Sequence, residues 1–306
     1  MKILVIGGTG FIGRHLVYEM KNHHEVIVLH RGSISEDDGY TSIKVDRRDL
    51  PFLRKTFEKI NPEIIIDLIP YFAQDAWDML NAFRGVSQRI IALSSGDAYR
   101  NYEIFKDNLG TVNRGPSKEE DALRQQLFPY RGINKEDFLL EHYDKILVEK
   151  VLQSQNEINV TILRLGAVYG AFDSQRKLKE YIQPMIQQKP RITIYQEKAN
   201  WKWTRVFVKD VVQAIMLSIE SNELSGHEIF NVGESTALSQ IDLLKKLKEI
   251  AKWNGEIEVG DESSENFNYQ QHLLLNTDKI RQLLGYRERF SLEERLSEAI
   301  AFEKSI

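Results

Sequence analysis

The first thirteen residues carry the pattern that most narrows the fold of this chain. A short apolar run, residues 3–6, has the composition of a strand buried inside a parallel sheet. Gly7, Gly10 and Gly13 follow it at GxxGxxG spacing, and an amphipathic helical pattern begins within the same segment. In such a turn the glycines permit a tight bend, close approach of a pyrophosphate to the backbone, and close contact between helix and strand. The strand–turn–helix order therefore predicts a dinucleotide-binding turn, in which the helix N-terminus attracts the phosphates.

The composition excludes several classes of protein. The chain has 306 residues, of which 42% are hydrophobic, enough for one large domain or two smaller ones. Its net charge is −4 and it has no long basic run, so we expect neither nucleic acid nor a membrane surface as a partner. It has no cysteine and no zinc-spaced ligand cluster, so we expect no metal site. No apolar run approaches the length of a membrane span and no targeting segment is visible, which leads us to expect a cytoplasmic location.

Apolar strands alternate with helical patterns through the first half of the chain. After the first strand we expect helices that alternate with strands at 25–31, 42–49, 63–69, 89–94 and 159–165. This order predicts an α/β fold with a Rossmann-type doubly wound parallel sheet, whose ligands bind beyond the carboxyl ends of the strands.

The chain is expected to divide into two parts. Residues 1–165 are predicted to form a dinucleotide-binding domain, to which a segment at about 204–232 returns. Residues 166–203 and 233–306 are predicted to form a smaller, mixed α/β C-terminal substrate lobe.

The middle of the chain gives three local expectations. Residues 100–137 are polar and poorly periodic, which predicts a long loop over the site with a short helix near 119–126. The periodicity of residues 138–153 predicts a single helix. Residues 201–208 alternate in polarity, which predicts a strand with Trp201 and Arg205 on one face.

The end of the second strand bears on the choice of dinucleotide. An acidic residue there would bind the adenosine ribose of NAD, whereas an arginine would accept the 2′-phosphate of NADP. The strand ends in His30 and Arg31, and no acid follows until Glu36. Because arginine is always charged and grips phosphate with two N–H groups, we favour NADP, with NAD as the alternative. The other interpretation of Arg31 is a solvated side chain at a strand end.

Several segments together resemble the extended short-chain dehydrogenase/reductases, the group that includes NAD(P)-dependent nucleotide-sugar epimerases and dehydratases. The resemblance covers nearly the whole chain and rests on GGTGFIG at 7–13, VDRRD at 45–49, LSSGDAY at 93–99, RLGAVYG at 164–170 and RVFVKDV at 205–211. It implies that the cofactor is contacted by Phe11, Ile12, Asp46, Arg47, Leu68, Lys145 and Val168, in addition to the glycines and Arg31. For the substrate it implies contacts from Asp97, Tyr169 and Arg205. The alternation that puts Trp201 beside Arg205 adds Trp201, for which packing within the smaller lobe is the alternative role.

The chain departs from this family at the residues that carry its chemistry. The family uses a Tyr-x-x-x-Lys pair on one helix and a Ser or Thr after the fifth strand. The matching segment here reads EHYDKILVEK at 141–150, which lacks that pair. We assign Ser95, Tyr143 and Lys145 as the catalytic residues that the resemblance implies.

Two registers are open for this helix. In the first, Lys145 is the catalytic lysine, with Glu149 four residues later, and Glu141 takes the tyrosine position. In the second, Tyr143 is the tyrosine and Leu147 takes the lysine position. We favour the first, because an aliphatic side chain can neither perturb a phenol nor bind a ribose.

Tyr143 and Lys145 lie about 200° apart around a regular helix, so they can converge only if the helix begins at or after Tyr143. Tyr99 and Tyr130 are the other candidates for a missing phenol. Asp97 falls where the dehydratases of the family carry an acid for elimination of water.

Two functions of different classes follow from these patterns. The first is an NAD(P)-dependent epimerase, dehydratase or reductase that acts on a nucleotide sugar by hydride transfer. The alternative is an NADP-binding sensor or scaffold with little catalysis, since atypical members of the group also lack the tyrosine. The resemblance also allows a homodimer formed through a helix pair.

Overall fold

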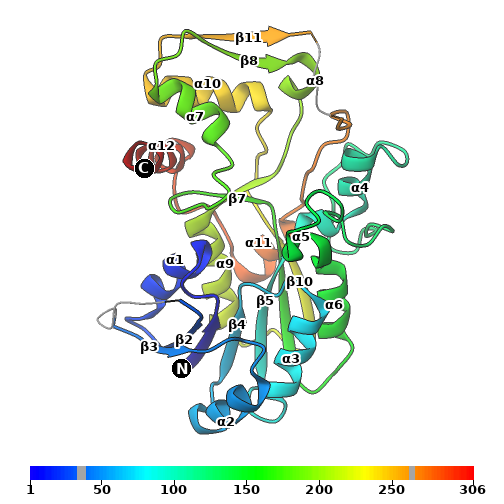
Figure 1. The fold of residues 1–306 in the computed structure, drawn as a ribbon, viewed down its shortest axis with the longest axis vertical. Coiled ribbons are helices and arrows are strands. Elements are labelled where there is room, and N and C mark those ends of the chain that lie inside the picture. Colours follow the sequence, from blue (N-terminus) through cyan, green and yellow to red (C-terminus); the bar gives the residue numbers. More distant parts are fainter. Residues whose placement is uncertain (33–38, 262–265) are drawn as a thin grey trace.

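The computed structural model describes residues 1–32, 39–261 and 266–306 of the chain (Figure 1). A seven-stranded sheet forms its centre, with the strand order β10-β6-β5-β4-β1-β2-β3 and parallel pairing throughout. The strands are β1 (Lys2–Ile6), β2 (Glu25–His30), β3 (Thr41–Lys44), β4 (Ile64–Asp67), β5 (Arg89–Ser95), β6 (Asn159–Leu165) and β10 (His227–Val232). The predicted Rossmann-type sheet is therefore confirmed.

Two layers of helices cover the sheet because its central strands are apolar on both faces. On one face, α1 (Phe11–Met20) and α9 (Val208–Glu220) share a core with Ile3 and Val5. On the other face, α2 (Leu50–Ile60), α3 (Ala73–Phe83) and α6 (Lys145–Gln153) share a core with Leu4 and Ile6. The alternation of the β1 side chains between these two cores fixes the strand between the layers.

A smaller group of elements lies beyond the carboxyl ends of the sheet strands, at the top of Figure 1. It contains the parallel pair β8 (Arg191–Tyr195) and β11 (Glu256–Gly260) and a second parallel pair, β7 (Ala167–Tyr169) and β9 (Arg205–Phe207). Its helices are α7 (Lys179–Ile186), α8 (Gln196–Ala199), α10 (Gln240–Ala251) and α12 (Leu292–Ser305). The segment expected to return at about 204–232 supplies α9 and β10 to the layers of the main sheet.

Outside residues 138–153, three local expectations were wrong. Residues 119–126 contain an isolated bridge between Tyr99 and Leu123 instead of a helix. The alternating segment 201–208 forms a strand only at Arg205–Phe207, because Lys202 and Trp203 before it form only isolated bridges, with Ser239 and Leu273 respectively. Residues 100–137 are not all loop, since α4 (Arg100–Asp107) opens them.

The segment expected to form one helix over 138–153 is broken in two. The short helix α5 (Phe138–His142) ends before Tyr143, and α6 begins at Lys145. Asp144 caps the second helix, because its carboxylate accepts hydrogen bonds from the N–H groups of Ile146 and Leu147. The remaining helix, α11 (Asp278–Leu284), packs beside β10. Among the described residues, no helix is both long and apolar enough to cross a membrane.

Candidate active site

The glycine turn between β1 and α1 has the geometry expected of a phosphate cradle. Gly7 adopts φ +86°, a conformation that side chains other than glycine rarely adopt. The N–H of Gly10 bonds the carbonyl of Gly7 at 3.0 Å, which closes the turn. A Cβ at Gly13 would lie 2.2 Å from the Gly7 oxygen, so only glycine lets α1 start this close to β1.

The residues expected at the adenosine end of the turn have different surroundings. Arg31 is exposed, directly after β2. Asp46 is also exposed, and its carboxylate accepts a hydrogen bond from the N–H of Arg48 at 2.9 Å. Arg47 turns inward instead, because its guanidinium bonds both oxygens of Asp67, at 3.0 and 2.7 Å, and pairs with Asp75. The Arg47 guanidinium is therefore already paired with two acidic side chains of the protein itself.

Tyr143 and Lys145 converge because the helix starts between them. Tyr143 precedes the cap residue of α6 and Lys145 is the first residue of that helix, so the helical angle between them does not apply. The Lys145 Nζ lies 5.8 Å from the centre of the Tyr143 ring. Glu141, the residue that the favoured register put at the tyrosine position, is on α5 and accepts a hydrogen bond from the N–H of Gly132. The structure thus keeps Lys145 from one register and brings Tyr143 to it from the other.

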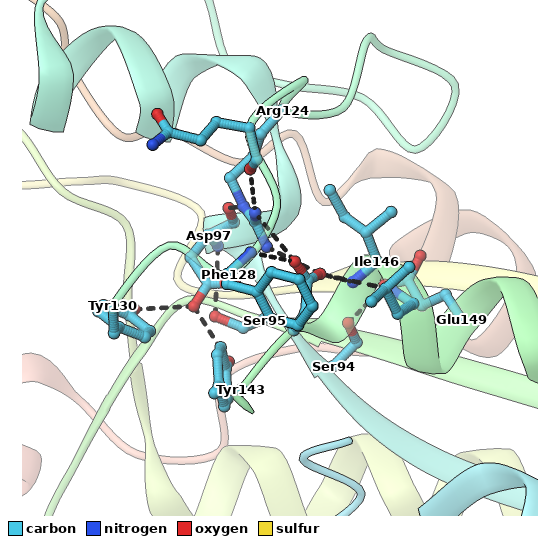
Figure 2. Close-up of polar contacts among 12 residues, drawn as sticks. Ser94, Ser95, Asp97, Arg124, Phe128, Tyr130, Tyr143, Ile146 and Glu149 are labelled. Carbon is cyan, nitrogen blue, oxygen red and sulfur yellow. Dashed lines mark hydrogen bonds and ion pairs between the residues drawn. The ribbon is translucent and has the colours of Figure 1, made fainter. Parts of the chain in front are cut away.

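Tyr143 faces the end of β5 (Figure 2). Its hydroxyl donates to Asp97 Oδ2 at 3.0 Å and is also hydrogen-bonded by Ser95. Ser95 accepts a hydrogen bond from the N–H of Asp97 at 3.2 Å, which leaves its own proton to donate. Burial, with a further contribution from the charge of Asp97, raises the pKa of Tyr143 well above its usual value.

Lys145 is buried at the same site. Its Nζ donates to the carbonyl oxygens of Pro70 at 2.7 Å and Leu93 at 2.9 Å. An ammonium has three protons, so one remains for a ligand. The ring of Tyr71 lies 5.1 Å from the same nitrogen. Burial lowers the pKa of Lys145 to about 8.

A buried ion pair fixes the start of α6. Asp144 pairs with Arg124, at 3.1 Å between Oδ1 and Nη2, and both side chains are 1% exposed. Asp144 also accepts from the N–H of Phe128 at 2.6 Å, and its own N–H donates to the carbonyl of Tyr71. The Nε of Arg124 donates to the carbonyl of Asp97 at 2.7 Å (Figure 2). This network connects the start of α6 to the backbone that carries Asp97.

These groups line a cavity of about 550 Å³ that opens between the sheet and the smaller group of elements. Its walls combine phenols, short polar side chains and apolar residues. The lining includes Ile12, Leu68, Tyr71, Ser95, Asp97, Tyr102, Tyr130, Tyr143, Lys145, Val168, Lys177, Trp203 and Leu275. The predicted residues Ile12, Leu68, Ser95, Asp97, Tyr143, Lys145 and Val168 therefore come together, whereas Phe11 packs beside His15 on α1.

The other residues expected to contact substrate have partners within the protein. Tyr169 donates to Glu234 at 2.8 Å. Arg205 donates to Gln240 at 2.9 Å and is buried. Trp201 stacks on Phe105 with ring centres 4.8 Å apart, which is the lobe-packing alternative for its role. Their contacts with a substrate stay predictions.

Sequence reasoning missed part of this site. Tyr71 was assigned no role, and Tyr130 was considered only as a substitute for the missing catalytic tyrosine. Arg124 carried no motif, since its partner Asp144 is 20 residues away. A visible signal was Asp144 itself, because aspartate is a strong helix-capping residue. In the described part of the chain, no group of His, Cys, Asp or Glu is arranged to hold a metal ion.

Comparison with known proteins identifies the class. The model of the NAD dependent epimerase/dehydratase family matches residues 3–102 and 141–233. The segment that carries Arg124 and Tyr130 lies between the two matched ranges.

Three known proteins illustrate the range of this similarity. The chain is 25% identical to chloroplast stem-loop binding protein of 41 kDa b of Arabidopsis thaliana, over 97% of this chain and 78% of that protein. It is 23% identical to dTDP-D-glucose 4,6-dehydratase of Dictyostelium discoideum, over 82% of this chain and 62% of that protein. UDP-glucuronic acid 4-epimerase from Bacillus cereus, solved in complex with UDP-glucuronic acid and NAD, has the same fold, with a TM-score of 0.75, 18% identity, and 100% and 99% of the two chains covered.

The parallel sheet and the glycine turn define a dinucleotide-binding fold of the Rossmann type. The chain belongs to the NAD dependent epimerase/dehydratase family, whose model matches more than half of its length. This confirms the family expected from the sequence, whose members are epimerases and dehydratases.

Proposed function

We propose that this protein is an NADP-dependent enzyme that oxidises a hydroxyl of a nucleotide sugar and reduces the resulting carbonyl, as an epimerase or dehydratase does. The observation that carries the proposal is the convergence of Ser95, Tyr143 and Lys145 on one cavity, despite the missing four-residue spacing. A chain that had lost catalysis would have no need to bring a phenol, a hydroxyl and a buried amine to one place.

The dinucleotide fits the glycine turn. Gly10 leaves the backbone open beside the N-terminus of α1, because a Cβ there would meet only the Gly7 oxygen, at 3.3 Å. When bound, the nicotinamide accepts and returns a hydride. Lys145 would hold the nicotinamide ribose with its remaining proton, and Asp46 would contact the adenine.

The chain's own groups would handle the proton of the reaction. Ser95 would donate a hydrogen bond to the substrate oxygen, and Tyr143 would give a proton to that oxygen or take one from it. Tyr71 and Trp203 line the same cavity and would orient the sugar. Burial in this cavity excludes water from the reacting atoms.

The preference for NADP is supported by Arg31, which is exposed at the carboxyl end of β2, where the fold places the adenosine ribose. The B. cereus epimerase was solved with NAD, so NAD is the competing cofactor. We expect Arg31→Ala to weaken NADPH binding about tenfold or more and to leave NADH binding nearly unchanged, because the arginine would contact only the 2′-phosphate. Fluorescence titration of the two reduced cofactors measures this, with Arg54→Ala on α2 as the control arginine.

A nucleotide sugar is supported as substrate by the UDP-sugar and dTDP-sugar enzymes among the relatives. A panel of UDP- and dTDP-sugars, followed by absorbance of reduced nicotinamide and by product analysis, tests it. Turnover that is lost in Tyr143→Phe and Ser95→Ala supports the proposal. Cofactor binding with no turnover on any member of the panel refutes it.

A second candidate function is favoured by one relative. The Arabidopsis protein is named as a stem-loop binding protein and matches 97% of this chain. If this protein is a cofactor-binding sensor or scaffold, it should bind NADPH but convert no nucleotide sugar. The net charge of −4 weighs against binding of RNA. The division into two domains, the cytoplasmic location and a homodimer stay predictions from the sequence.

A further inference from the structure

One buried carboxylate that lines the cavity accepts hydrogen bonds from two phenols. Asp97 Oδ2 accepts hydrogen bonds from Tyr130 at 2.8 Å and from Tyr143 at 3.0 Å (Figure 2). Its other oxygen, Oδ1, is buried without a hydrogen-bond partner among the described residues. Burial raises the pKa of Asp97. A carboxylate in these surroundings is a better proton acceptor than one in water.

The charged groups around this carboxylate leave it free to change its protonation. Arg124 directs its Nε to the carbonyl of Asp97 and its Nη atoms to Asp144, so the arginine is already paired with another acid. Lys145, the second cation, donates to two backbone carbonyls. Ser95 accepts from the N–H of Asp97, at the end of β5. The direct partners of the carboxylate are therefore the two phenols.

The groups around the hydroxyl oxygen of Tyr143 also favour proton transfer to the carboxylate. Its partners are Ser95 and Asp97, while the ammonium of Lys145 lies 5.8 Å from the ring centre. Of these groups only the carboxylate can accept the proton of the phenol, because serine is a far weaker base and a protonated lysine has no lone pair. Tyr130 reaches Asp97 from the segment outside the family match and is hydrogen-bonded in turn to Tyr102 on α4.

We propose that Asp97 is the proton acceptor of Tyr143, so that a phenol and a carboxylate form the acid–base pair of this site, with Tyr130 as a positioning residue. The proposal rests on the proposed function, because it concerns the proton of a substrate hydroxyl. It differs from the role that the resemblance implied for Asp97, which was direct action on the substrate in elimination of water.

The proton transfer balances in atoms and electrons. During oxidation the substrate carbon loses a hydride to the nicotinamide dinucleotide, and the electron pair of the substrate O–H bond forms the second bond of the carbonyl. The substrate proton joins the Tyr143 oxygen as the proton of that phenol moves to Asp97 Oδ2. Asp97 becomes a carboxylic acid, and reduction of the carbonyl returns both protons by the reverse path.

Asp97→Asn separates this role from a structural one. The amide oxygen can accept the same two phenol bonds and the amide nitrogen takes the place of Oδ1, which has no partner to lose. We expect a single turnover of the cofactor-loaded protein, read as absorbance of reduced nicotinamide, to slow about 10²-fold or more. The dissociation constant for the cofactor should stay within about twofold of wild type. Asp78→Asn, on α3 and hydrogen-bonded to Gln74, is the matched control and should keep the wild-type rate.

Carbon NMR of the aspartate carboxyl groups supplies a readout that needs no turnover. The Asp97 resonance is the one that Asp97→Asn removes. We expect Tyr143→Phe and Tyr130→Phe each to raise the pKa of Asp97, because each removes a donor that stabilises the carboxylate. Tyr130→Phe should also move the acidic limb of the rate profile to higher pH, and Tyr102→Phe should move it less.

Three results would overturn the proposal. An Asp97→Asn protein that reduces nicotinamide at the wild-type rate would leave Asp97 with a structural role. Normal reduction with loss of water elimination alone would show that Asp97 acts on the substrate directly. An Asp97 titration that neither Phe variant changes would show that the phenols do not bond the carboxylate. If the wild-type protein oxidises no nucleotide sugar, the proposed function fails, and the titration still decides whether Asp97 and Tyr143 form a pair.

Discussion

Replacement of Asp144 by alanine should weaken the protein more than loss of an ordinary helix cap. Asp144 caps α6 through the N–H groups of Ile146 and Leu147, bonds the N–H of Phe128, and pairs with Arg124. All of these contacts end in one carboxylate that is 1% exposed. Asp144→Ala therefore removes the cap and leaves a guanidinium buried without its counter-ion.

The ion pair sets the size of the effect. Loss of an N-cap costs about 1 kcal/mol of unfolding free energy. An arginine left buried without its partner costs about 3–5 kcal/mol. Since the same carboxylate serves both roles, we do not add the terms and expect a loss of about 3–5 kcal/mol. That is a large part of the roughly 5–15 kcal/mol that stabilises a typical protein.

The control is another aspartate cap in the same stretch of chain. Asp137 caps α5 through the N–H groups of Leu139 and Leu140 and is only half-buried. Among the described residues, its carboxylate accepts hydrogen bonds from those two groups and forms no ion pair. Asp137→Ala should cost only about 1 kcal/mol. Urea unfolding, followed by tryptophan fluorescence, compares the two variants. If Asp144→Ala costs no more than Asp137→Ala, the buried ion pair does not stabilise the start of α6.

A double substitution tests the cause. Replacement of both Asp144 and Arg124 by apolar residues removes the unpaired charge, so Asp144→Ala with Arg124→Met should be less damaging than the two single losses combined. Asp144→Asn should keep the start of α6, because asparagine caps as well as aspartate, while it loses the charge opposite Arg124. Additive losses in the double variant would refute the coupling between these two residues.

Two further predictions concern the cradle and the buried amine. A Cβ at Gly10 would meet only the Gly7 oxygen, at 3.3 Å, so Gly10→Ala should unfold near the wild-type urea midpoint. It should nevertheless bind NADPH more than about tenfold more weakly. Gly13→Ala should bind NADPH more weakly and also lose about 1–3 kcal/mol of unfolding free energy. Burial lowers the folded-state pKa of Lys145 to about 8 from 10.5, so the unfolded chain binds more protons between these values and the stability of wild type should rise with pH in that window. Urea titrations at several pH values should show this rise in wild type and not in Lys145→Met.

The sheet could be predicted because its signal is local. The strands β1, β2, β4, β5 and β6 are short apolar runs, and burial on both faces demands that composition at each strand. The strand β11 was missed because three of its five residues are exposed, so its sequence, EIEVG, carries no such run. The helix α4 was missed because RNYEIFKD is mostly polar, and its buried residues include the polar Asn101 and the charged Glu103.

The site could be predicted only where it depends on single segments. The glycine turn, Ser95 and Lys145 each follow from their own stretch of sequence. The position of the Tyr143 phenol depends on Arg124 and Asp144, which the fold brings together although they belong to no shared motif. Tyr130 likewise reaches Asp97 across 33 residues of chain.

A spacing of four residues is one way to bring a tyrosine and a lysine side chain together, and this structure shows another. On a continuous helix, residues i and i+4 share a face, so a pair at that spacing converges without further help. At a spacing of two, the side chains on a continuous helix point in different directions. They can converge only if a new helix begins at the second residue, with the residue between them as its cap. Asp144 has that position, and its carboxylate bonds the N–H groups of the helix that begins at Lys145. A Tyr-x-Lys pair in this family should therefore be functional only where x caps a helix, and the buried partner that holds the cap becomes part of what the site requires.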